Sequence, residues 1–169
     1  LSVNAAKRDL GASKTSKPTD YTKTAIDHFI AGRKLILAAG DTLTADELTQ
    51  LEAHRDAIVG AWEGALAATV IHYVNDVLED MDKMSGPDYK YTDHAKHWSE
   101  LKGFALGLQF NPHGKSLGAL ADFHTKVGDK PVLKTATQKE KDDYKAALIA
   151  ARDALGAAMG YDEELVKGW

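Results

Sequence analysis

Residues 45 to 82 limit the fold more than any other segment, because their pattern predicts one long helix. Thr44 and Glu47 form a capping box, a Thr or Ser followed three residues later by Glu, which marks a helix start. Large apolar residues then recur at helical spacing: Leu48, Leu51, Ile58, Trp62, Leu66, Val70, Tyr73 and Val77. Small residues between Gly60 and Thr69 would let another helix approach closely. A helix of this kind needs other helices to cover its apolar side.

Similar signals predict further helices on both sides of this segment. Asp20 can cap a helix over about 21–39 that ends at Gly40, and a second capping box, Thr137 to Glu140, opens a long helix closed by Gly160. Between them we expect a helix that starts at Thr92 or Asp93 and stops at Asn111-Pro112, and a short one over 116–126; Asp162 can cap a last turn that ends at Trp169. With no alternating strand pattern, the expected fold is an all-α antiparallel bundle of four main helices plus short ones, over residues 20–169.

Two expectations concern the N-terminal part of the chain. Residues 1–19 show no apolar periodicity and contain Ser, Lys, Thr and a Pro, so we interpret them as a linker or a strap across a neighbouring surface. In the helix over 21–39, the apolar stripe is predicted to be buried, with Arg33 close to it as either a paired buried residue or one whose charged end reaches water. The stripe consists of Ile26, Phe29, Ile30 and Leu37.

Composition excludes several classes of site. The chain of 169 residues has a net charge of −4 and no cysteine, which rules out disulfides, thiolate metal ligands and a thiol nucleophile. No broad basic face is expected, so nucleic acid is not an expected partner, and no apolar run reaches the roughly 20 residues of a membrane-spanning helix. The sequence begins with Leu1, and we expect that a leader or a preceding segment has been removed.

The candidate site lies on the helix after Tyr91. His97 and Glu100 are three residues apart, so they share one side of a helix, and His94 lies a further turn back. These three residues are predicted metal ligands; the alternative is a hydrogen-bonded His/Glu pair without metal. Glu63 and His72 lie in the apolar part of the long helix, where each is either a satisfied core polar group or a supporting member of the site.

Three blocks of sequence resemble the imelysin-like proteins of bacterial cell envelopes. They are His97-Trp98-Ser99-Glu100 with the following LKGFALGLQFNP, the F-x-x-G-R block from Phe29 to Arg33, and GALAATVIHYVN from Gly64 to Asn75. The resemblance covers roughly residues 20–112. It implies a protein of two related helical bundles with a metal-binding or iron-linked role in the periplasm, at the outer membrane or outside the cell; some members are peptidases.

The sequence departs from that family in two ways. It holds one H-x-x-E and is about half the expected length, which suggests a C-terminal half whose partner is a preceding bundle or a second chain. Ala95 also stands where the fuller G-x-H-x-x-E motif has its glycine.

Three functions follow from these observations. The first is a metal-binding, iron-handling envelope protein that takes a divalent or ferric ion, iron or zinc, at His97, Glu100 and His94, with Glu63, His72 and Arg33 in support. The second is a structural or interaction module without metal. The third is a metallopeptidase, which lacks support here because the chain contains no H-E-x-x-H and no third ligand at a recognised spacing.

Overall fold

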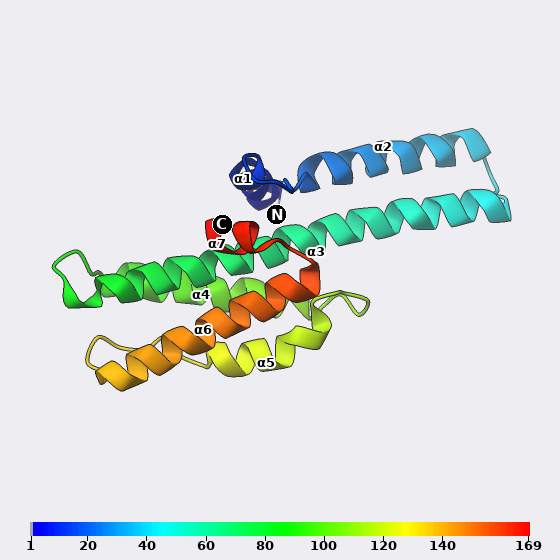
Figure 1. The fold of residues 1–169 in the computed structure, drawn as a ribbon. Coiled ribbons are helices and arrows are strands. Elements are labelled where there is room, and N and C mark those ends of the chain that lie inside the picture. Colours follow the sequence, from blue (N-terminus) through cyan, green and yellow to red (C-terminus); the bar gives the residue numbers. More distant parts are fainter. Residues whose placement is uncertain (1) are drawn as a thin grey trace.

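Helix α3 (Ala45–Asp82) runs through most of the length of the molecule (Figure 1). It begins at the predicted capping box, where the Thr44 hydroxyl accepts a bond from the Glu47 amide and the Glu47 carboxylate accepts one from the Thr44 amide. The computed structural model describes residues 2–169, and these contain helices and no strand, so the all-α prediction is confirmed. The other helices are α1 (Ser2–Ala12), α2 (Tyr21–Ala39), η1 (Lys83–Ser85), α4 (Tyr91–Leu108), α5 (Leu117–Val127), α6 (Gln138–Met159) and α7 (Glu163–Gly168).

The core lies between the C-terminal half of α3 and helices α4, α5 and α6. It is built from fully buried aliphatic and aromatic side chains, each of which stabilises the fold by about 1.5–3 kcal/mol through removal of apolar surface from water. They include Val70, Ile71, Val74 and Val77 of α3, Leu101 and Leu108 of α4, Phe123 of α5, and Leu148 and Leu155 of α6. We call this part of the molecule the body.

Residues 2–12 form helix α1, a helix that the interpretation of residues 1–19 as a linker or a strap did not include. Ala5, Arg8 and Ala12 are buried, and the Arg8 carbonyl accepts a hydrogen bond of 3.2 Å from the Trp169 indole. Helix α1 thus packs across α3, α2 and α7. The sequence hid this helix because its inward side carries alanines and an arginine in place of large apolar residues.

Helix α2 corrects the second expectation, because its apolar stripe is not covered by the body. Exposed fractions are 52% for Ile26, 51% for Phe29, 49% for Ile30 and 71% for Leu37. Helix α2 and the first half of α3 project together beyond the other helices (Figure 1). Among residues 21–62, which we call the arm, only Gly32 and Ala61 are buried. A third layer that would cover the arm does not exist within residues 2–169.

Helix α3 and the adjoining η1 also meet, by length and composition alone, the requirements of a membrane-spanning helix. Of the most apolar stretch, 56% is buried inside the protein. The core helix of a folded domain has the same properties, so this finding is weak evidence for a membrane span.

Candidate functional site

His97 of α4 faces two aspartates on α3. Its Nδ1–H donates a hydrogen bond of 2.7 Å to Oδ2 of Asp80, and its Nε2 lies 4.0 Å from Oδ2 of Asp76. Asp76 and Asp80 are one helical turn apart, so both carboxylates project from α3 toward α4. Asp80 therefore fixes the orientation of the imidazole and leaves Nε2 directed at the second carboxylate.

The predicted supporting residue His72 reaches the same carboxylate. Its Nε2 lies 3.3 Å from Oδ2 of Asp76, so this oxygen is close to imidazole nitrogens from both α3 and α4. Burial, followed by the nearby Arg8 guanidinium, lowers the pKa of His72. A lowered pKa keeps the imidazole neutral near pH 7, the form in which histidine binds metals.

Glu100 lies one turn after His97, beside Tyr73 of α3. Its Oε2 is buried and has no hydrogen-bond partner within residues 2–169; Nζ of Lys96 lies 4.0 Å away. Burial and then the proximity of Glu100 raise the pKa of Tyr73. His97 and Glu100 therefore both lie on the side of α4 that meets polar side chains of α3.

A cation from α1 also reaches this region. Arg8 is 8% exposed, and burial lowers the pKa of its guanidinium while Asp76 and Tyr73 oppose that change. The cluster thus combines the carboxylates of Asp76, Asp80 and Glu100 with one buried arginine. We call His72, Asp76, Asp80, His97 and Glu100 the His/Asp cluster.

Three predicted site residues lie outside the His/Asp cluster: His94, Arg33 and Glu63. His94 is fully buried, and its Nδ1 is 3.1 Å from the Tyr89 hydroxyl, with which it shares a hydrogen bond. Arg33 is exposed on α2, in the arm and outside the His/Asp cluster. No contact among the described residues supports its predicted role in the site.

Glu63 is a satisfied core group, the first of the two alternatives for this residue. Its Oε1 accepts bonds of 2.9 and 2.8 Å from the amide and hydroxyl of Ser116, and its Oε2 accepts one of 3.3 Å from Asn111. A side chain on Gly114 would collide with this carboxylate at 2.6 Å. Glu63 thus fixes the loop between α4 and α5.

The donor set of the His/Asp cluster is suited to a cation. Imidazole and carboxylate ligands bind zinc, iron and manganese, and Oε2 of Glu100 is buried and accepts no hydrogen bond from residues 2–169. Within residues 2–169, no group of three or more His, Asp or Glu side chains is arranged so that it could hold a metal ion. Binding would therefore require side-chain adjustment.

Sequence reasoning missed Asp80 and Arg8. Asp80 lies one turn after Asp76 and two turns after His72, a signal that could have been found on α3 alone. Arg8 gave no such signal, since its role depends on α1 packing over α3.

In comparisons with known proteins, no protein family, no curated protein and no solved structure matches the chain.

Proposed function

We propose that this protein binds a transition-metal cation at the His/Asp cluster, through His72, Asp76, His97 and Glu100. The observation that carries the proposal is the hydrogen bond from His97 Nδ1 to Asp80, because it fixes the ring while its Nε2 faces Asp76. Metal-binding histidines almost always donate their other ring nitrogen to a carboxylate or carbonyl in this way. Asp80 is then a positioning residue and not a ligand.

The chemistry of the donors favours zinc, ferrous or ferric iron, or manganese over calcium or magnesium. Two imidazole ligands suit the first group, whereas calcium and magnesium bind almost entirely through oxygen ligands. The lowered pKa of His72 supports the same conclusion, since no proton has to leave this ring before binding near pH 7.

The resemblance of the H-x-x-E block to imelysin-like proteins extends the proposal to a biological setting. On that basis we assign the protein to iron handling in the bacterial cell envelope, in the periplasm, at the outer membrane or outside the cell. His97 and Glu100 occupy the matching positions of the motif, and Ala95 replaces its glycine. His94 is not among the proposed ligands, because it is bonded to Tyr89.

Calorimetric titration of metal-depleted protein with Zn(II), and with Fe(II) under anaerobic conditions, tests the proposal. We expect one cation per chain. His97→Ala should remove binding, and Asp80→Asn should weaken it by roughly 10–100-fold, the usual effect of losing the group that orients a metal-binding histidine.

His113→Ala is the matched control, since His113 is an exposed histidine outside the cluster. This variant should bind like the unmodified protein, and circular dichroism should show the same helix content in all variants. Absence of binding by the unmodified protein, or equal affinity in His97→Ala and His113→Ala, would contradict the proposal.

A further inference from the structure

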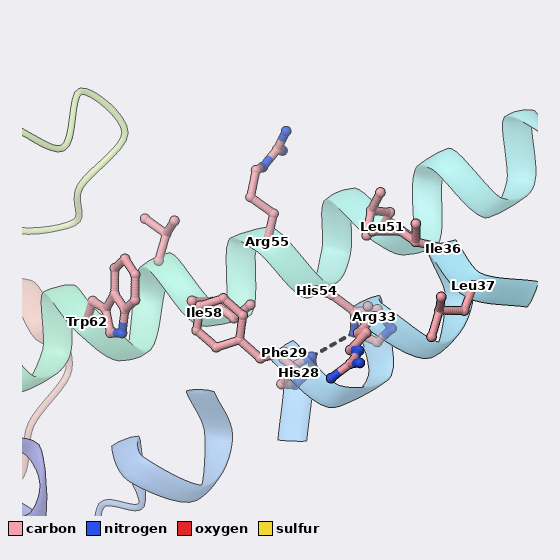
Figure 2. Close-up of a pocket in the computed structure, with 12 residues that line it drawn as sticks. His28, Phe29, Arg33, Ile36, Leu37, Leu51, His54, Arg55, Ile58 and Trp62 are labelled. Carbon is pink, nitrogen blue, oxygen red and sulfur yellow. Dashed lines mark hydrogen bonds between the residues drawn. The ribbon is translucent and has the colours of Figure 1, made fainter. Parts of the chain in front are cut away.

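The arm carries an open apolar groove between α2 and α3. Figure 2 shows side chains from both helices along it, and the groove has a volume of about 520 Å³. Phe29 and Leu37 of α2 and Trp62 of α3 line it and are 51%, 71% and 45% exposed. Large exposed apolar patches on a folded protein mark interaction sites.

Contacts between the two helices keep this groove in a defined shape. Gly32 lies where the two helices meet, since a Cβ there would be in van der Waals contact with Leu51 at 3.4 Å. Nδ1 of His28 and Nδ1 of His54 share a hydrogen bond of 2.9 Å across the two helices, which Figure 2 marks with a dashed line. The rings of Phe29 and Trp62 are 5.9 Å apart. The groove is therefore a formed surface.

The pattern of apolar residues indicates what kind of partner the arm fits. Both helices carry an apolar stripe at spacings of three and four residues that remains largely exposed, and two helices with one uncovered side are half of a four-helix bundle. The exposed members are Ile26, Phe29, Ile30, Ile36 and Leu37 on α2, and Leu48, Val59 and Trp62 on α3. A second pair of antiparallel helices would complete the bundle.

The opposite net charges of the two helices favour a second copy of this chain as the partner. Helix α2 has a net charge of +2, from Lys23, Arg33 and Lys34 against Asp27. Residues 45–60 of α3 have a net charge of −3, from Asp46, Glu47, Glu52 and Asp56 against Arg55. With α2 of each copy beside α3 of the other, every helix of the bundle would have neighbours of opposite charge, which stabilises the pairing.

The dimensions of the arm suit such a dimer. Helix α2 has 19 residues, so it is about 28 Å long, and two helices side by side are about 20 Å wide. The resulting footprint, of the order of 560 Å² before surface relief is counted, is close to the roughly 600–1,000 Å² per partner of stable interfaces.

We propose that two copies of this chain associate through their arms, with α2 of each copy packed against α3 of the other. The proposal goes beyond cation binding and does not depend on it, because the arm and the His/Asp cluster share no residue. Sedimentation in buffer with a metal chelator therefore tests the dimer alone.

Sedimentation equilibrium over a series of protein concentrations should show a monomer–dimer equilibrium. Phe29→Glu and Leu37→Glu each place a charge in the apolar interface and should weaken association at least 100-fold. Leu133→Glu is the matched control, since Leu133 is 47% exposed and lies in the loop between α5 and α6, outside the arm, and it should leave the equilibrium unchanged. A chain that stays monomeric at all concentrations, or a dimer that tolerates both arm variants, would overturn the proposal.

The dependence of dimer affinity on salt concentration distinguishes the proposed pairing, in which α2 lies beside α3 of the other copy, from a pairing in which the two α2 helices lie side by side. Neighbours of opposite charge predict weaker association when NaCl rises from 0.05 to about 0.5 M, because the attraction is screened. Stronger association over this range would show that like-charged helices are neighbours, and would overturn the proposed pairing.

Discussion

Three histidines on α3 and α4 illustrate how surroundings decide the role of a residue. His72 and His97 both lie close to Asp76, whereas His94, three residues before His97, is fully buried beside Tyr89. Burial lowers the pKa of His94. The spacing of His94, His97 and Glu100 predicted that all three could meet one ligand. Three residues fall short of a full turn by about 60°, so His94 and Glu100 point about 120° apart around α4, and His94 lies in the core.

His94 predicts acid sensitivity of the fold. Because its folded-state pKa lies below the ordinary value of about 6.5, the unfolded chain binds a proton first as pH falls. The free energy of unfolding is therefore not reduced by this histidine above about pH 6.5, and it decreases progressively as pH falls from there toward the lowered pKa of His94. We expect a lower melting temperature at pH 5.5 than at pH 7.5.

The variant His94→Gln tests whether His94 causes the acid sensitivity, because it replaces the imidazole with a neutral side chain that does not titrate. The decrease in melting temperature between pH 7.5 and 5.5 should be smaller in the variant than in the unmodified protein. Part of the decrease should remain, since the pKa of His72 is also lowered. Equal decreases in both proteins would show that His94 does not carry the effect.

Among the elements, helix boundaries could be predicted wherever local chemistry sets them. Both capping boxes mark the starts of α3 and α6, and Gly40 and Gly160 adopt positive φ at the ends of α2 and α6. Helix α4 differs, because it begins at Tyr91 without a side-chain cap. The burial of α2 was predicted wrongly, because periodicity shows that a helix has an apolar side but not which element covers it.

The short helix α7 is held by polar contacts that sequence spacing cannot reveal. The Asn75 amide donates bonds of 3.0 and 2.8 Å to the carbonyls of Val166 and Trp169, and Arg152 donates one of 2.9 Å to Asn75. The Trp169 ring meets Tyr161 edge to face at 4.9 Å. These contacts join α7 to α3 and α6.

Trp169→Ala should lower the free energy of unfolding by about 3 kcal/mol, the lower end of the range for removing a buried tryptophan. Trp169 is 7% exposed, and its indole also bonds to α1 through the Arg8 carbonyl. Urea denaturation measures the change. Phe110→Ala, at an exposed aromatic residue, should change it by less than about 0.5 kcal/mol. Similar losses in the two variants would mean that Trp169 does not anchor α7.

At the scale of the whole molecule, the body and the arm differ in how much apolar surface they bury. Sequence patterns predicted helices α2 to α7 and their order, but neither helix α1 nor this division, because the division depends on which sides of the helices meet in three dimensions. The same holds for the candidate site. His97 and Glu100 could be predicted from one helix, whereas the carboxylate oxygens close to His97 come from Asp76 and Asp80 on another.

Hydrogen exchange should distinguish the arm from the body. In Leu37→Glu, which is designed to remain monomeric, amides of α2 and residues 45–60 should exchange at least 10-fold faster than those of residues 65–81. A factor of 10 corresponds to an opening free energy lower by about 1.4 kcal/mol. The reason is that the arm depends mainly on contacts between α2 and α3, and only the start of α2 is also bonded to α1, through the Tyr21 amide and Asp9. Uniform protection along α3 would contradict this division.

Helix α3 is continuous and contains no proline, so Trp62 in the arm and His72 in the body belong to one straight segment. Ten residues separate them, about 15 Å along the axis. Two chains joined by their arms would consequently hold their two His72 rings at one fixed spacing. Paramagnetic labels on the solvent side of each body would then report a single narrow distance.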